Sequence, residues 1–408
     1  MMKKIFFVFV LFFSTSLLAQ QLEMEGKLEE RDMEALIQWI RGKRLVTVKE
    51  IGGDLSLSGE VRTEMQATSE VKNGIKQRGP KGVTPKPACA LDAEVNLMLD
   101  YRTERTWASI KLEFDNDMGT QSGTTNKIAL EKAYFGGRMI AGNSFTLDGE
   151  LGRRNLMNVF ESVVEFASIF DGAVLKFNKV FNSIGDFYIN GGTFLINDRN
   201  YHLGYVAEMG LLRIGNTGFF SKCSLISWEK HLFKSDKNPR WNFLIGQALV
   251  GYQITPQNWQ KLIKIYLAGL VNFAAQRLPV TNNQLARTAW YAGMSVGKII
   301  KEGDWAFDIN YQWVQAQAVP DYDSAGIKRG NAENVGMYTM SIDGVGNPTT
   351  SKTAVGNENF CGLQIEALYA ITNGLTMLYN FKYSNTLNLD IGPDLKYRQF
   401  EIEFIYAF

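Results

Sequence analysis

Hydrophobic and polar residues alternate along most of the chain. In the segment 304–313, DWAFDINYQW, every second residue is apolar or aromatic, and the residues between them are Ala, Asp, Asn or Gln. Successive side chains of a β-strand point to opposite faces, so this segment has one apolar and one polar face. Similar alternation occurs at 54–65, 92–102 and 106–115. The pattern therefore predicts a chain built mainly from amphipathic strands.

We expect about 16 strands, an even number that is typical of bacterial single-chain barrels. Long connections such as 153–170 and 317–359 alternate with short ones such as 103–105 and 372–373, as when loops gather at one rim and turns at the other. The predicted fold is all-β, a transmembrane antiparallel β-barrel. About 14 or about 18 strands are the alternatives, because the strand pattern is weak at 196–230 and the register of the segment WNFLIGQALVGY is ambiguous. The predicted strands cover residues 54–65, 92–102, 106–115, 128–138, 144–152, 171–178, 184–195, 200–209, 219–229, 241–253, 260–273, 287–298, 303–316, 360–371, 374–384 and 396–408.

The last of these strands is strongly amphipathic. One face carries Phe400, Ile402, Phe404, Tyr406 and Phe408, whereas Gln and Glu stand between them. In a soluble protein such a strand would be an edge prone to aggregation. A closed barrel has no edge and turns the apolar face to lipid, so the pattern favours a membrane barrel over a packed sandwich.

The first residues differ from the rest of the chain. Residues 1–19 contain two Lys, a run of apolar residues and then small residues, which is the pattern of a secretory signal peptide. Residues 20–53 are expected to form a periplasmic lead-in with a short amphipathic helix at 21–41, acting either as an association helix or as a cap on the barrel mouth. The barrel is expected to span 54–408.

Composition narrows the function classes. The chain has 38 Gly, only 9 Pro, and 8 Trp, 16 Tyr and 26 Phe, with mean hydropathy just below zero, which suits strands that match each lipid-facing residue with a polar one. A net charge of +1 argues against nucleic acid as a partner. Three Cys make a disulfide framework improbable. Past residue 20 no run of 18 apolar residues occurs, so helical spanning is not expected.

On these residues the chain resembles the Gram-negative outer-membrane porins of the 16-stranded type. The signal peptide, the alternating strands and the terminal aromatic strand carry the resemblance, together with the segments LEKAYFGGRM, LDGELGRRNLMNVFE and FDGAVLKF. The resemblance implies location in the cell outer membrane and a water-filled channel for passive diffusion of small hydrophilic solutes and ions. It also implies lipid, lipopolysaccharide and the barrel assembly machinery as partners, the last reading Phe400, Ile402, Phe404, Tyr406 and Phe408 as an assembly signal. The amino-terminal helix leaves open whether the chain forms a homo-oligomer.

General porins narrow their channel with the third outer loop, which falls here at 153–170. The resemblance implies a pore constriction formed by Arg153, Arg154, Glu161 and Glu165. The alternative is a loop that packs on the outer rim and covers the mouth with Phe160, Phe166 and Phe170. Candidate pore-lining residues on the strands have mixed charge, which predicts weak ion selectivity; they are Glu94, Asp100, Arg102, Lys111, Glu113, Glu131, Lys176, Lys264, Lys382 and Arg398.

Two other function classes are an enzyme built on a barrel and an adhesin or structural barrel. An enzyme built on a barrel needs an activated nucleophile or base, and the only two histidines, His202 and His231, lack a nearby Ser or Asp arrangement, so no enzymatic activity is expected. An adhesin or structural barrel acting through long surface loops is the alternative function, because 317–359 is long and polar. The FDND segment at 114–117 offers two carboxylates, too few for a metal site, and no metal or cofactor is expected.

Overall fold

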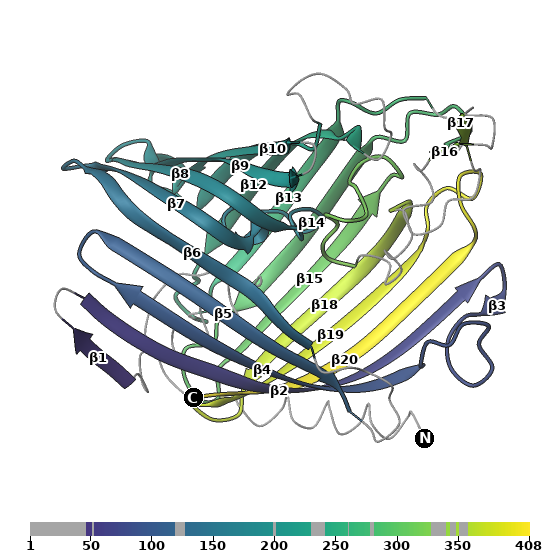
Figure 1. Cartoon of the computed structure of the whole chain (residues 1–408), viewed down its shortest axis with the longest axis horizontal. Helices are drawn as coiled ribbons and strands as arrows, with labels where there is room; N and C mark the ends of the chain where they lie inside the picture. The colour runs from purple at the N-terminus through teal and green to yellow at the C-terminus, as the bar shows by residue number, and fades with distance from the viewer. Residues whose placement is uncertain are drawn as a thin grey trace.

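Sixteen strands in the described part of the chain form one closed antiparallel barrel (Figure 1). The computed structural model describes residues 46–50, 53–118, 127–198, 201–229, 241–259, 261–277, 281–327, 340–342, 348–350 and 358–408. The barrel strands are β2 (Gly53–Lys72), β4 (Cys89–Arg102), β5 (Thr106–Asp117), β6 (Lys127–Ala141), β7 (Phe145–Asn155), β8 (Ile169–Phe181), β9 (Gly185–Asn197), β10 (His202–Leu212), β11 (Phe219–Ser227), β12 (Leu244–Ile254), β13 (Ile263–Asn272), β14 (Thr288–Gly297), β15 (Trp305–Val314), β18 (Phe360–Ala370), β19 (Leu375–Thr386) and β20 (Leu395–Ala407).

These strands confirm the predicted sixteen, each overlapping its expected range. Most ends differ by a few residues, but β2 runs seven residues past the predicted end at 65 because 66–72 pair with β20. The alternatives of about 14 or about 18 strands are wrong for the described barrel.

Short elements lie at the two ends of the barrel. β1 (Val46–Glu50) pairs with the start of β2, whereas β3 (Ile75–Lys76) pairs with its end. β16 (Met340–Ile342) and β17 (Pro348–Thr350) form a separate hairpin. Figure 1 shows β1 at one end and β3, β16 and β17 at the other. The predicted signal peptide and amphipathic helix lie outside the described residues, and no helix within the described ranges is long and apolar enough to span a membrane.

Two strands distant in sequence close the barrel. β20 pairs antiparallel with β2 from Glu60↔Ala407 to Lys72↔Leu395. The backbones of Gly59 and Phe408 extend this seam, since each N–H donates to the other's carbonyl at 3.0 and 2.9 Å. The seam therefore satisfies the backbone groups that an open sheet would leave unpaired.

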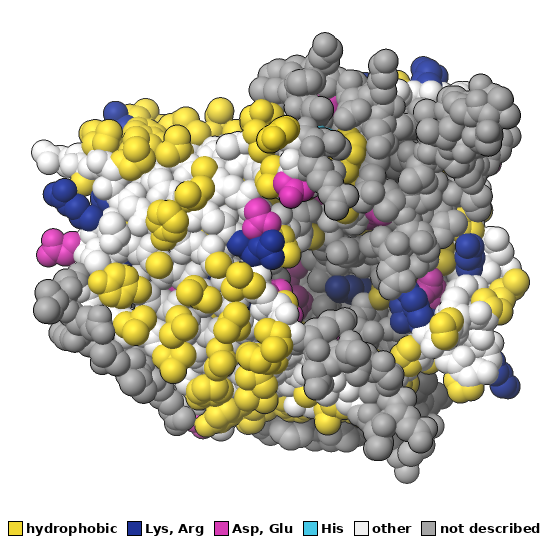
Figure 2. Space-filling model, in the orientation of Figure 1, with side chains coloured by type: hydrophobic (Ala, Val, Ile, Leu, Met, Phe, Trp, Pro, Cys, Tyr) yellow, Lys and Arg dark blue, Asp and Glu magenta, His cyan; other side chains and the backbone are white. Residues whose placement is uncertain are grey.

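The outward face is apolar and aromatic. Phe400, Phe404 and Tyr406 are 40%, 39% and 45% exposed on the outer face of β20, as the alternation predicts. Figure 2 shows hydrophobic side chains spread over the outer wall, with few charged ones among them. Each Å² of apolar surface left in water costs about 25 cal/mol, so a wall of this kind is stable in contact with lipid.

The interior divides into a packed part and a polar part. The segment 156–168 between β7 and β8, named here the inward loop, and the second inward segment, 315–327 after β15, are largely buried. They pack against inward side chains of β8–β15 in one apolar cluster that includes Phe160, Phe166, Phe170, Phe194, Val206, Phe220, Ile245, Leu249, Tyr291 and Ile327. The inward faces of β2, β4, β5 and β20 instead carry charged side chains.

The packing at the closing seam predicts that the barrel does not tolerate a larger side chain at Gly59. A Cβ built there lies 2.5 Å from the Phe408 ring, so Gly59→Val is expected to destabilise the folded barrel by about 1–3 kcal/mol, the usual cost of overpacking. The measurement is the folded fraction on semi-native gels as temperature rises. Gly191→Ala is the control, because a Cβ at Gly191 meets nothing within 4 Å; equal losses in the two variants would contradict the prediction.

Candidate functional site

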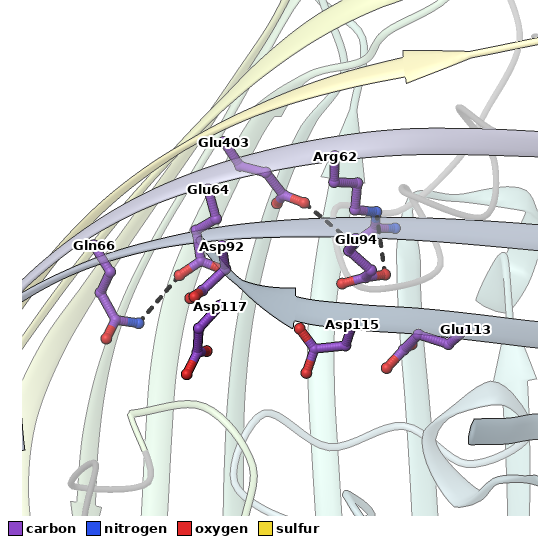
Figure 3. A pocket seen from close by; sticks show the side chains of 9 residues that line it. All are labelled: Arg62, Glu64, Gln66, Asp92, Glu94, Glu113, Asp115, Asp117 and Glu403. Carbon is purple, nitrogen blue, oxygen red and sulfur yellow. Dashed lines mark hydrogen bonds and ion pairs between the residues drawn. The ribbon is translucent and has the colours of Figure 1, made fainter. Parts of the chain in front are cut away.

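An acid-lined recess opens on the polar side of the barrel interior (Figure 3). The recess has a volume of about 240 Å³. Its described lining has seven carboxylates, one guanidinium and one amide: Arg62, Glu64, Gln66, Asp92, Glu94, Glu113, Asp115, Asp117 and Glu403. We name these nine residues the acidic recess.

Strand register gathers the carboxylates. Glu64 of β2 stands opposite Asp92 of β4 on one side and Glu403 of β20 on the other. Asp92 in turn stands opposite Asp117 of β5. Figure 3 shows the side chains of Glu64, Asp92 and Asp117 close together. Like charges directly opposite each other destabilise a sheet, so fold stability does not explain this arrangement.

Arg62 partly neutralises the recess. Its guanidinium lies 2.5 Å from Oε1 of Glu60, 3.4 Å from Oε1 of Glu403 and 3.8 Å from Oε1 of Glu94. These partners come from β2, β20 and β4, so one side chain links the first strand of the barrel to the last. The described lining holds seven carboxylates against one guanidinium, and this excess of acidic groups gives the recess a negative field.

Where the inward loop leaves the barrel wall, a short ladder of two backbone hydrogen bonds joins its two ends. The Leu156 N–H donates to the Ser168 carbonyl and the Met157 N–H to the Phe166 carbonyl, both at 3.0 Å. Beyond this ladder the loop reaches the opposite strands, because Gln247 Nε2 of β12 donates to the Glu161 carbonyl at 2.7 Å. The loop therefore crosses part of the interior instead of covering the outer rim.

Glu161 fixes the tip of the inward loop through buried charges. Its carboxylate pairs with Lys222 of β11 and, at 3.0 Å, with Lys264 of β13. Its backbone N–H donates to Glu208 Oε2 of β10 at 2.8 Å. All four side chains are nearly fully buried. Removing one partner of a buried pair is costly because the other charge is left without compensation.

The second inward segment holds the base of the inward loop. Asp323 accepts hydrogen bonds from the backbone N–H groups of Ser168 at 2.9 Å and Phe166 at 3.3 Å. The Ala325 N–H donates to the Val164 carbonyl at 3.1 Å. The two segments therefore form one packed unit within the barrel.

Glu165 stands beside this contact and has no hydrogen-bond partner among the described residues. It is 1% exposed, and neither carboxylate oxygen has a hydrogen-bond partner within the described structure. Burial, together with the nearby charge of Asp323, raises the pKa of Glu165 well above its usual range.

The structure separates the four residues predicted to form the constriction. Glu161 and Glu165 lie in the interior on the inward loop, whereas Arg154 is buried against Glu150 and over the Tyr134 ring. Arg153 is 39% exposed and pairs with Asp171 at 2.7 Å on the outward face. The assignment of Arg153 to the constriction is therefore wrong, because β7 continues to 155 and turns consecutive residues to opposite faces.

The predicted pore-lining residues fall into several environments. Glu94 and Glu113 line the acidic recess, and Lys111 pairs with Glu131 at 3.0 Å. Lys264 is buried under the inward loop. The others are placed as follows: Lys176 pairs with Glu150 at 2.8 Å, Asp100 accepts from Ser109 Oγ at 2.6 Å, Arg102 is exposed at the end of β4, and Lys382 stands between Gln364 and Gln399 in register.

Arg398 does not face the pore. It is exposed on the same face of β20 as Phe400, two residues along the strand, whereas Gln399 between them is buried. The prediction for Arg398 is therefore wrong.

Several residues of the interior were not predicted. Arg62, Glu64, Asp92, Asp115, Asp117 and Glu403 follow the same alternation as Glu94 and Glu113, so that signal would have found them. Asp323 gave no such signal, because it lies in a connection without periodicity.

Comparison with known proteins gives structural likeness only. No protein-family model matches the chain. No curated protein matches it either. Among solved structures, the chain is similar to OprB of Pseudomonas putida at high pH, with 10% identity, a TM-score of 0.49, and coverage of 88% of this chain and 94% of that one. It is also similar to OmpF of Salmonella typhi, with 12% identity, a TM-score of 0.49, and coverage of 89% and 100%.

A third similar structure is the outer membrane channel DcaP of Acinetobacter baumannii, with 10% identity, a TM-score of 0.46, and coverage of 88% and 99%. All three TM-scores lie below 0.5, so the function proposed below depends on the geometry of this barrel.

The buried charges around Glu161 predict a stability effect. Glu161→Gln leaves Lys222 and Lys264 without their carboxylate and is expected to cost about 3–5 kcal/mol. Thermal unfolding of the barrel measures the loss. Asp186→Asn is the matched control, since the Asp186–Arg213 pair is largely exposed and is worth about 0–1 kcal/mol. The same small loss in both variants would show that the Glu161 cluster does not stabilise the fold.

Proposed function

We propose that the protein is an outer-membrane porin, a channel for passive diffusion of small hydrophilic solutes and ions. The observation that carries the proposal is the contrast between the two faces of one closed barrel. The outer wall is apolar, whereas the recess inside is lined by charged groups that require water or ions. Lipid on one side and water on the other satisfy both faces.

The inward loop is the proposed constriction. It fills the part of the interior next to β9–β13 and leaves the charged faces of β2, β4, β5 and β20 free of it. Solutes would therefore pass along the acidic recess and the neighbouring Lys111 and Glu131. Glu161 and Glu165 act in this proposal by placing the loop, and Arg154 by pairing with Glu150 at the end of β7.

Lipid, lipopolysaccharide and the barrel assembly machinery remain the proposed partners, together with small polar solutes. Phe400, Phe404, Tyr406 and Phe408 stand exposed on the outer face, where lipid and a receptor for an assembly signal would meet them. The proposal includes no enzymatic activity. His202 is buried with Nε2 at 2.9 Å from the Trp228 carbonyl oxygen, and His231 lies outside the described residues.

A structural barrel acting through surface loops is the second candidate. It is favoured by one observation, the dense packing of the inward loop and the second inward segment within the barrel. A sealed interior would support this candidate, and an open one supports the channel.

Conductance of the purified, refolded protein in a planar bilayer tests the proposal. Discrete and reproducible current steps are expected. A β-rich protein that inserts into the bilayer and never conducts would contradict the channel and favour the structural barrel.

The charge of the recess predicts cation preference, in place of the weak selectivity expected from the sequence. In a salt gradient, the zero-current potential of the wild type is expected to report cation over anion permeability, most strongly below about 0.1 M salt, where screening is weak. The triple variant Glu64→Gln, Asp92→Asn and Asp117→Asn is expected to move that potential toward zero. Glu104→Gln, in an exposed short turn, is the control; a triple variant with wild-type potential would contradict the prediction.

A further inference from the structure

Two segments far apart in sequence meet at Asp323. Besides its two side-chain hydrogen bonds to the inward loop, Asp323 accepts the Ala167 N–H on its backbone carbonyl at 3.1 Å. The Ser168 hydroxyl donates to the Tyr322 carbonyl at 3.0 Å. The position of the inward loop therefore depends on a residue more than one hundred and fifty positions later in the chain.

Glu165 is buried against this contact. Its carboxyl group is 1% exposed, that of Asp323 is fully buried, and the two interact electrostatically. Within the described structure neither oxygen of Glu165 receives a hydrogen bond. An ionised and unpaired carboxylate is very costly at such a site, whereas a protonated one is tolerated.

The backbone next to Glu165 is strained. Phe166 has a φ of 76°, in the left-handed region that a bulky residue rarely adopts. The Asp323 carboxylate and the packing of the Phe166 ring on Phe160, at 5.6 Å between centroids, hold this conformation. This backbone strain is released if the contact opens, which favours release of the loop.

We propose that the Glu165–Asp323 carboxyl pair is a proton-dependent latch, which holds the inward loop on the second inward segment while Glu165 is protonated and releases it when Glu165 ionises.

The direction of the pH dependence follows from the burial of Glu165. Its pKa is raised in the docked loop and returns to the ordinary value near 4.5 when the loop is released. The docked state therefore binds the extra proton, and its stability falls as pH rises from the ordinary pKa to the raised one. Below the ordinary pKa, both states are protonated and pH has no effect.

Among the described residues, the surrounding charges do not supply a counter-ion to Glu165. Asp321, two residues from Asp323, is buried and also acidic. The remaining groups on the packed elements have partners of their own: Glu161 with Lys222 and Lys264, Glu208 with Tyr188, Arg154 with Glu150, Asp308 with Ser295 and Tyr266, Arg153 with Asp171, and His202 with the Trp228 carbonyl. Glu229 and Glu358 are buried acids with contacts elsewhere.

Backbone hydrogen exchange of residues 156–168 tests the latch directly. Rates are measured from about pH 5 to about pH 8 on the full-length folded protein and divided by the intrinsic rates. Between the ordinary and raised pKa, wild-type exchange is expected to accelerate by up to about tenfold for each pH unit. Glu165→Gln, which cannot ionise, is expected to lose this dependence.

Glu131→Gln is the matched control, since Glu131 is a half-buried interior acid of β6 paired with Lys111, and it is expected to keep the wild-type dependence. Glu165→Leu, also uncharged, provides a second variant if Glu165→Gln folds poorly. Wild-type exchange without pH dependence would overturn the latch. An identical acceleration in either uncharged variant would overturn it as well.

The consequence of the latch for the passage of solutes through the barrel rests on the proposed porin function. Liposome swelling in uncharged sugars reports pore size independently of wall charge. Faster swelling at about pH 8 than at about pH 5 is expected for the wild type, and equal rates for Glu165→Gln. If the exchange result holds and no swelling occurs at any pH, the latch stands and the channel is contradicted.

Discussion

The structure depends above all on the pairing of every wall strand with two neighbours. A backbone N–H or C=O left unpaired in hydrocarbon costs several kcal/mol, and a barrel avoids this cost only when its first and last strands meet. Here β2 and β20 pair over thirteen positions, and Gly59 and Phe408 extend the seam by two further hydrogen bonds. Arg62 reinforces the same seam from inside, because it contacts Glu403 of β20 and Glu94 of β4.

Closure creates an interior that must be filled by side chains, by loops or by water. In this barrel, side chains and loops fill one side of the interior, and charged groups line the other side. On the side of β8–β15, apolar residues of the inward loop and the second inward segment pack against the wall, with the buried Glu161 cluster fixing their position. On the side of β2, β4, β5 and β20, seven carboxylates line the described recess, and such a density of charge is stable only where water and counter-ions reach it. In the proposed channel, the packed side would set the width of the pathway and the acidic side would set its charge.

The strands and their outward faces could be predicted from the sequence, because alternation is a local property of each segment. All sixteen strands were found, and Phe400, Phe404 and Tyr406 point outward as expected. The two wrong predictions, for Arg398 and Arg153, also concern the alternation within a single strand. Alternation that turns Phe400 outward does the same to Arg398, and Arg153 cannot share a face with Arg154 while β7 continues through both.

The interior contacts could not be predicted in the same way. Asp323 meets the inward loop only because the barrel brings β8 and the end of β15 to the same interior, a relation that no local pattern encodes. The unequal distribution of charge has the same origin. Listed along the chain, the candidate lining residues have mixed sign, but the register of four adjacent strands gathers the acids and leaves Arg62 as the only cation among the described lining residues.

The most direct test of the account asks which part of the interior conducts. Single-channel current is recorded before and after a charged thiol reagent is added to variants carrying one cysteine, in a background where Cys89, Cys223 and Cys361 are replaced. The account predicts that Glu94→Cys, in the acidic recess, is blocked, whereas Gln247→Cys, beneath the inward loop, conducts as before. Block at position 247 without block at position 94 would contradict it.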